Sequence, residues 1–477
     1  MASSIFEMPI KPYTIRFRFI LAFVSFVSFY VMTMSYRGFE LQNWDMRGYP
    51  GEGKIYGRLA ESRAAGGPFT HAGLLGWKYS AEEKKELRQI RPDLSEREAR
   101  SYIISAPYQL PKFMTSNSPG SPPPTARPPA GISLEQELAT EFQHPRFDPI
   151  FYPYRSQSGL QGLIYYYLDK LYHDPLVLRS FCALFLAAAL AWWIYFVAGS
   201  FGLFPAIASF AGIIFLTTLL KSGDNVAHVT GANVLIVVAL FAVFQKNIPW
   251  LGIAVYALLL FKLLISGAEY AFAAALMPFV PLLFYAVLQN RPWKIIRRDM
   301  ARIIAAVTLA FLSAFFLLFS QIVTLTGSPW EATSHFVNRI IFRTVITPIA
   351  NHHPSNPTSL DALVERYLAF PAFTAGNMNV SYIQFIMLLG AVSIVASIIC
   401  RYRPDRQLLA LIITCWASIF CPLAWIILGR GHSVSETATD RIVWHMPFTL
   451  LAILLVSVTF QRAAMTIRAH AETKRIL

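Results

Sequence analysis

Apolar residues in this chain gather in long runs, and one long polar stretch separates the first run from all the others. The first run covers 19–35, and the polar stretch extends from 36 to 177. Each later run has about 20 residues, the length that an α-helix needs to cross a bilayer. The later runs cover 178–198, 202–220, 227–244, 249–266, 270–289, 303–325, 380–399, 407–428 and 443–460. The pattern predicts an all-α polytopic membrane protein with about ten transmembrane helices.

Lysine and arginine residues orient these ten segments, because cytoplasmic loops carry an excess of positive charge. With the N-terminus in the cytoplasm, every strong basic cluster falls on the cytoplasmic side. The clusters are Arg291, Lys294, Arg297, Arg298 and Arg302; Arg401, Arg403 and Arg406; and Arg462, Arg468, Lys474 and Arg475. Both termini are therefore predicted to be cytoplasmic. The predicted outer loops are 36–177, 221–226, 267–269, 327–378 and 429–442.

The first apolar run follows three basic residues, as the apolar region of a signal peptide does. No small-x-small cleavage site follows it, and the next residues are bulky and charged. An uncleaved first span is therefore predicted. The chain then divides into a cytoplasmic tail with the first transmembrane helix (1–35), an extracytoplasmic loop (36–177), a transmembrane helical bundle (178–460) and a cytoplasmic basic tail (461–477).

Composition agrees with a membrane protein and argues against a soluble or a nucleic-acid-binding protein. Hydrophobic residues make up 55% of the chain and charged residues 14%, with a mean hydropathy of +0.45, which leaves too little polar surface for a soluble protein. The net charge of +14 does not indicate a nucleic-acid partner, because the basic residues flank apolar runs, where they meet anionic lipid. The four cysteines lie in or beside apolar runs, so neither a disulfide framework nor a cysteine-ligated metal is predicted.

The first outer loop has its own organisation. Residues 81–105 are charged and carry a capping box at Ser95 and Glu98, which predicts a solvated helix. Residues 120–131 are rich in proline and predict a semi-rigid linker. Residues 158–172 are apolar and aromatic, which predicts a helix along the membrane interface, where tyrosine is favoured.

Candidate catalytic residues are carboxylates of this loop. Glu52 follows a Tyr-Pro-Gly turn and lies four residues before Tyr56 and eight before Ala60. On a helix these three side chains share one face. Asp45 and Asp148 are the other carboxylates that the loop offers for the same role.

Further unusual polar residues cluster at the predicted outer face. Ionisable residues at membrane depth are costly and need a reason, although a loop residue is often polar only because water surrounds it. That ordinary explanation is weakest for residues at or inside the ends of the apolar runs, which include Lys262. The candidate substrate-binding residues are Tyr56, Arg155, Gln157, Lys221, Asp224, His228, Glu269, His432, Arg441 and His445.

This organisation resembles the GT-C superfamily of integral-membrane glycosyltransferases. The similarity lies in one span, a long external loop that opens with an acidic residue ahead of Tyr and Ala, an interfacial helix, and many spans with short loops. In that superfamily the first external loop resembles Asp-Glu-x-x-x-Tyr-x-x-x-Ala, and an acidic residue there is the catalytic base or part of its site. This chain has the single acid Glu52 followed by Gly53, so Asp45 remains an alternative base.

The resemblance implies an inverting transfer of a sugar from a polyprenyl-phosphate-linked donor to a lipid, polysaccharide or protein acceptor outside the bacterial inner membrane. Glu52 or Asp45 would deprotonate the acceptor hydroxyl. Arg441, Lys221 or Arg155 would hold the departing lipid phosphate. For Arg441, a salt bridge with Asp440 or a snorkelling side chain is the alternative.

No cofactor is implied. His228, His432 and His445 offer a metal site together with Asp224, but the sequence contains no His-x-x-x-His or comparable ligand pair. Hydrogen bonding to sugar or phosphate is the favoured role for these histidines.

Two other classes of function stay open. A multispan transporter or flippase would show internal repeats and charges near the bilayer midplane, whereas here the charges gather at one rim and no repeat is visible. An O-antigen-type polymerase or ligase resembles the favoured class in its substrates but places its large loop late in the chain. Here the large loop comes first.

Overall fold

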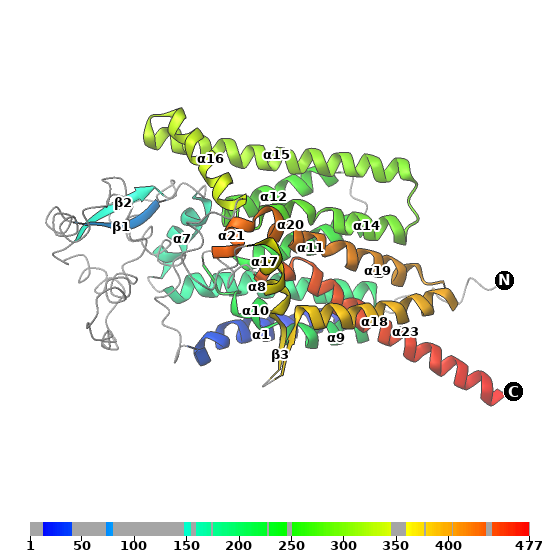
Figure 1. Cartoon of the computed structure of the whole chain (residues 1–477). Helices are drawn as coiled ribbons and strands as arrows, with labels where there is room; N and C mark the ends of the chain where they lie inside the picture. Colours follow the sequence, from blue (N-terminus) through cyan, green and yellow to red (C-terminus); the bar gives the residue numbers. More distant parts are fainter. Residues whose placement is uncertain are drawn as a thin grey trace.

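The computed structural model describes residues 13–40, 73–79, 147–153, 159–172, 175–226, 229–245, 250–344, 359–375, 378–402, 404–435 and 441–476. Helices dominate these residues, and the long helices run in roughly one common direction (Figure 1). The predicted solvated helix at 81–105 and the linker at 120–131 lie outside the described residues.

Seven helical stretches among the described residues are long and apolar enough to cross a membrane. They include the continuous helices α1 (Tyr13–Glu40), α8 (Pro175–Ser200), α15 (Trp293–Thr326), α18 (Tyr382–Tyr402) and α23 (Phe448–Ile476). Three shorter apolar helices are α9 (Leu203–Ile214), α11 (Thr230–Gln245) and α12 (Leu251–Ser266). The chain is therefore a helical membrane protein. Each of the ten predicted segments coincides with one of these stretches or shorter helices, and the number of spans itself stays a prediction.

Three predicted segments are each broken into two α-helices. Segment 202–220 contains α9 and α10 (Thr217–Lys221), segment 270–289 contains α13 (Ala271–Leu276) and α14 (Phe279–Leu288), and segment 407–428 contains α19 (Arg406–Ser418) and α20 (Phe420–Leu428). Pro278 explains the second break, since proline has no backbone N–H to donate. At the first break, Phe215 and Leu216 donate their N–H groups to the carbonyls three residues earlier, a tightening typical of helix ends.

One end of the bundle collects the basic turns. Gln407 Nε2 donates to the Ser200 carbonyl at 2.6 Å, and Arg462 Nε lies 2.8 Å from Asp405 Oδ2. These contacts join the end of α8, the start of α19 and the middle of α23. In Figure 1 the turn between α14 and α15 and the C-terminal end of α23 lie at the same, right-hand end. We call this the basic end.

The opposite end is called the polar end. It comprises α10, the turn Gly267–Tyr270 and four short elements. These elements are α16 (Pro329–Thr344), α17 (Leu360–Ala369), α21 (Arg430–Ser435) and the 3₁₀ helix η4 (Arg441–His445). Helix α21 packs against α16, α17 and α20, and η4 packs against α10 and α20.

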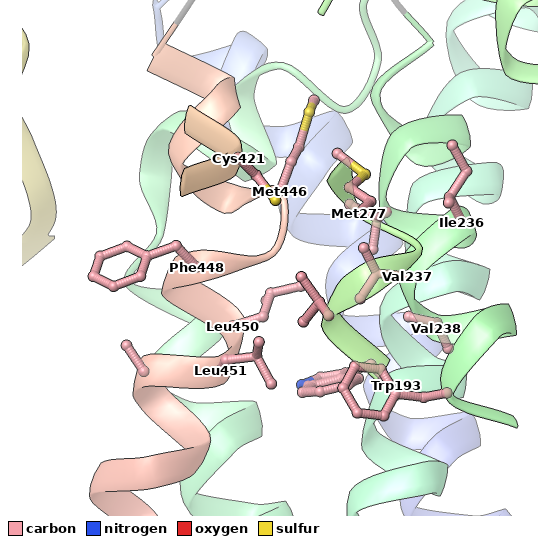
Figure 2. Packing of buried hydrophobic residues seen from close by; sticks show 14 of the residues in the cluster. Trp193, Ile236, Val237, Val238, Met277, Cys421, Met446, Phe448, Leu450 and Leu451 are labelled. Carbon is pink, nitrogen blue, oxygen red and sulfur yellow. The ribbon is translucent and has the colours of Figure 1, made fainter. Parts of the chain in front are cut away.

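The core lies between α8, α11 and α23. Figure 2 shows Trp193 of α8 and Val237 of α11 packed near Met277 and near Leu450 of α23. In an 18-residue apolar segment of the stretch that includes α23, 94% of the residues are buried inside the protein. In the corresponding segments of α1, α15 and α18 the buried share is 17% each. Helix α23 is therefore central, and the other three present apolar surface outward.

Two antiparallel strand pairs, which the sequence pattern did not predict, accompany the helices. Strand β1 (Gly73–Tyr79) pairs with β2 (Phe147–Pro153), with Lys78 opposite Asp148. Strand β3 (Pro371–Ala375) pairs with β4 (Met378–Ser381) beside the start of α18.

The predicted interfacial helix at 158–172 is present as α7 (Leu160–Leu171). One of its faces packs on the bundle, since the Tyr165 hydroxyl donates to the Val226 carbonyl at 2.7 Å. Its other face leaves Tyr167 and Leu171 exposed. The helix is thus confirmed, and its contact with the membrane interface remains a prediction.

Candidate functional site

Several predicted site residues lie outside the described residues. They are Glu52, Asp45, Tyr56, Arg155, Gln157 and His228. Asp148 lies in β2, where the structure describes the backbone alone. The structure therefore bears on six of the predicted site side chains: Lys221, Asp224, Glu269, His432, Arg441 and His445.

These six residues all lie at the polar end. Lys221 ends α10 and Asp224 lies in the turn that follows. Glu269 lies in the turn between α12 and α13, His432 in α21, and Arg441 and His445 in η4. Segments more than 200 residues apart in sequence thus meet at one end of the bundle, and contacts organise most of their polar side chains into two clusters.

The first cluster is centred on Glu269, a residue only 8% exposed. Arg343 Nη2 of α16 lies 3.1 Å from Glu269 Oε1, and His432 Nε2 of α21 lies 3.3 Å from Glu269 Oε2. Arg343 Nη1 also donates to the Ala268 carbonyl at 2.8 Å. Because each carboxylate oxygen faces a nitrogen partner, Glu269 is suited to fixing α16 and α21 in place.

Lys262 completes this Glu269 cluster, which consists of Lys262, Glu269, Arg343 and His432. The Lys262 side chain is fully buried in α12. Its Nζ donates to the Gly267 carbonyl at 3.2 Å and to the backbone carbonyl of Glu269. It thereby closes the turn that orients Glu269, in which Gly267 and Tyr270 both have a positive φ.

Glu269 and Arg343 form a pair of opposite charges, and Lys262 and His432 each add a positive charge when protonated. Buried cations are tolerated where they are paired or where a site uses them. This balance favours an anionic group close to Arg343 and Lys262. Arg343 was not identified from the sequence. The available signal was that it is a basic residue in a predicted outer loop, where the positive-inside rule disfavours positive charge.

The second cluster is centred on Arg441. The Arg441 Cζ atom lies 3.7 Å from the centroid of the Phe370 ring, a cation–π contact. Tyr382 at the start of α18 stacks on Trp444, with ring centroids 4.6 Å apart, and its ring lies 6.4 Å from that of His445. Asp440, the salt-bridge partner considered from the sequence, lies outside the described residues. The Arg441 cluster consists of Arg441, Phe370, Tyr382, Trp444 and His445.

Buried polar atoms in and beside the Arg441 cluster have unused hydrogen-bonding capacity. Tyr382, Trp444 and His445 are each 1% exposed, and Ser433 of α21 is fully buried. Among the described residues, the Tyr382 hydroxyl, Trp444 Nε1, His445 Nε2 and Ser433 Oγ have no hydrogen-bond partner. Burying such groups unpaired is costly, so each keeps capacity for a hydrogen bond to water or to a polar ligand.

Lys221 and Asp224 form a third polar position. Asp224 is 2% exposed in a turn that the Thr230 hydroxyl closes by donating to the Ser222 carbonyl at 2.8 Å. This turn leads from α10 into α11 and packs against α7 through Val226. It lies at the same end as the two clusters because α10 packs against η4.

In the part of the chain that the structure describes, no three His, Cys, Asp or Glu side chains converge as metal ligands. Family models, curated proteins and solved structures were compared with the chain, and none of them matches it.

Proposed function

We propose that the chain is an integral-membrane glycosyltransferase that moves a sugar from a polyprenyl-phosphate-linked donor to an acceptor on the extracytoplasmic face of the bacterial inner membrane. In this proposal ten spans leave both termini in the cytoplasm and the polar end outside. The observation that carries it is the presence of both the Glu269 and the Arg441 clusters at the end of the bundle opposite the basic turns.

Charge supports a lipid-phosphate donor. Positive residues are disfavoured on the outer side of a membrane protein, yet Lys262, Arg343 and Arg441 all lie at the polar end. Arginine and lysine bind phosphate oxygens through strong, charge-assisted hydrogen bonds. A donor whose phosphate lies at the membrane surface and whose tail lies in lipid would bring its anion to this depth.

Buried polar atoms of the Arg441 cluster support a sugar substrate. The Trp444 indole N–H is a donor, and the Tyr382 hydroxyl both donates and accepts. Such groups are suited to the hydroxyls of a sugar. Since aromatic rings also offer apolar surface, the cluster combines the two properties that a sugar site needs.

The reaction needs a base as well. In the proposed step the acceptor oxygen attacks the anomeric carbon of the sugar, and the bond from that carbon to the phosphate oxygen breaks. The acceptor proton passes to a carboxylate, for which Glu52 is the first candidate and Asp45 and Asp148 are the alternatives. The phosphate leaves on its polyprenyl chain, and attack from the opposite side inverts the anomeric carbon.

Binding of the lipid phosphate tests the placement of the cations. The full chain, purified into lipid nanodiscs, would be titrated with radiolabelled polyprenyl phosphate. Arg441→Gln and Arg343→Gln are expected to weaken binding about tenfold or more, as the loss of a charged hydrogen bond implies. Arg406→Gln is the matched control, because Arg406 is an exposed arginine at the basic end. Equal affinities for all four proteins would refute the lipid-phosphate site.

A multispan transporter or flippase is the second candidate function. The gathering of buried charge at one end of a helical bundle is compatible with entry of a polar substrate. Such a protein would bind or move a lipid-linked substrate without breaking its glycosidic bond. Transfer of labelled sugar therefore separates the two candidates.

A further inference from the structure

Helix α16 has one face that packs on the protein. Ala332 is fully buried, and the Phe336 ring lies 4.5 Å from the ring of Phe315 on α15. Arg343, near the C-terminal end of this face, reaches Glu269. The end of the helix is held by Arg430, whose Nε donates to the Thr344 carbonyl at 2.8 Å.

A different face of α16 carries large apolar side chains that are exposed within the described chain, with the exposed Ser334 among them. Trp330 is 77% exposed, Ile340 60%, Val337 49% and Ile341 47%. Trp330, Val337 and Ile341 are spaced by seven and then four residues, about two turns and one turn, so they share one side of the helix. Large apolar side chains exposed on a surface helix are suited to contact with lipid or with another protein.

The helix before α16 in the chain also exposes apolar side chains. Helix α15 is 34 residues long, about 50 Å at 1.5 Å per residue, and its side chains Leu309, Leu312 and Phe316 are exposed. The chain reverses at Gly327, which has a φ of 69°. Figure 1 shows α16 folding back beside the end of α15. Helix α16 therefore packs against a helix whose own apolar side chains are largely exposed.

We infer that α16 is an interfacial helix whose face of Trp330, Val337 and Ile341 lies against membrane lipid at the boundary between headgroups and acyl chains. Lipid is the occupant because α16 directly follows and packs against a helix of membrane-spanning length, and because its exposed face includes a tryptophan, a residue enriched at this boundary. This inference rests on the membrane nature of the chain and is independent of the proposed glycosyl transfer.

Contact of α16 with lipid would also fix the position of the Glu269 cluster relative to the membrane. Lipid would contact one face of α16, while Arg343 on the inner face contacts Glu269. A helix seated on the membrane surface would thereby hold a cation of the cluster at a fixed depth. That depth is where a headgroup-level anion would meet it.

Spin-label accessibility tests the seating. Single cysteines would be introduced by Val337→Cys and Ile341→Cys, with Asn338→Cys as the control on the adjacent, polar and exposed side. The full chain would be studied in nanodiscs of phosphatidylcholine and phosphatidylglycerol. Labelled wild-type protein would correct for the native cysteines, of which Cys182, Cys415 and Cys421 are buried.

Labels at 337 and 341 should collide more with oxygen, which concentrates in lipid, than with a water-soluble nickel chelate. The label at 338 should show the reverse preference. Nickel access at 337 and 341 equal to that at 338 would overturn the inference, and so would protection from both reagents, which would indicate a covering protein.

A second measurement covers the case in which a cysteine variant fails to fold. Wild-type and Trp330→Phe proteins would be compared in nanodiscs with lipids brominated near the headgroup. The wild-type fluorescence should lose an additional component that the variant lacks. A Trp330 component that is quenched by aqueous iodide and not by any brominated lipid would overturn the inference.

Discussion

Arg343 and Glu269 are 74 residues apart in sequence, and their side chains form an ion pair of 3.1 Å. Arg343 belongs to α16, and Glu269 belongs to the turn between α12 and α13. His432 of α21 contacts the other oxygen of the same carboxylate. One carboxylate therefore connects three parts of the polar end.

Removing the carboxylate should be more harmful than removing the arginine. Glu269→Gln leaves the buried Lys262 and the partly buried Arg343 without their counter-charge, and breaking a fully buried ion pair costs about 3–5 kcal/mol. Arg343→Gln leaves Glu269 with His432 and Lys262, so its cost should be smaller. Thermal unfolding of the purified variants in detergent measures the difference. A lower stability of Arg343→Gln than of Glu269→Gln would contradict this role of the Glu269 carboxylate.

Close packing of α8 against α11 gives a prediction from glycine. A Cβ atom at Gly231 would lie 2.6 Å from the backbone nitrogen of Leu186, whereas one at Gly390 would meet no atom within 4 Å. Small residues let membrane helices approach this closely. Gly231→Ala should therefore lower the midpoint of thermal unfolding, and Gly390→Ala should leave it unchanged or slightly raised. Equal behaviour of the two variants would argue against this packing.

The ten apolar segments were predictable because helix length and hydropathy follow directly from the bilayer. The helix break at Phe215 was not, since no proline follows within the next turn and the apolar pattern continues across it. The break at Ile419 had a local signal, because Pro422 cannot donate a hydrogen bond to the Ser418 carbonyl, where α19 ends. Helix α15 begins at Trp293, ten residues before the predicted segment, because a helix can extend beyond the bilayer through charged residues. Hydropathy marks only the part of the helix that lies in the bilayer.

The candidate site was predictable as a set of unusual polar residues and not as a set of contacts. Glu269 and His432 stood out because they are ionisable residues beside apolar runs. Their pairing with Arg343 depends on how α16 folds back, which no local pattern encodes. Phe370 under Arg441 was missed for a similar reason, since an aromatic residue in a loop carries no signal of a cation above it.

Arg441 should matter for donor use through its charge and its shape. Arg441→Ala should weaken donor binding by about 1.5–3 kcal/mol, the range for a hydrogen bond to a charged group. Arg441→Lys should recover only part of this, because lysine lacks the planar fork of arginine. Phe370→Leu should weaken binding less, by about 0.5–2 kcal/mol. Unchanged donor affinity in all three variants, measured by titration in nanodiscs, would assign Arg441 a structural role alone.

Topology gives a prediction that is independent of any substrate. A single cysteine at position 118 should react with a membrane-impermeant reagent added outside intact cells, and cysteines at positions 294 and 403 should not. The ten-span arrangement requires this result, because the long loop is outside and the basic turns are inside. Labelling of all three positions from the same side would refute that arrangement and the outward placement of the polar end.

The carboxylates of the first loop test the enzyme itself. Glu52→Gln keeps the shape of the side chain and removes the proton acceptor, so it should lower turnover by about 10²–10⁴-fold while leaving expression and folding intact. Asp45→Asn and Asp148→Asn are the matched comparisons. If Asp45→Asn is inactive and Glu52→Gln is active, the base is Asp45 and the proposed reaction stands.

The most direct measurement is the lipid and glycan profile, by mass spectrometry, of a deletion strain complemented with wild type or with each of these three variants. We expect the deletion strain to accumulate a polyprenyl-phosphate-linked sugar and to lack that sugar on one acceptor. Wild type should reverse both changes, and Glu52→Gln should reverse neither. Full reversal by all three carboxylate variants, or a deletion strain whose lipids and glycans equal those of the parent, would contradict the proposed glycosyl transfer.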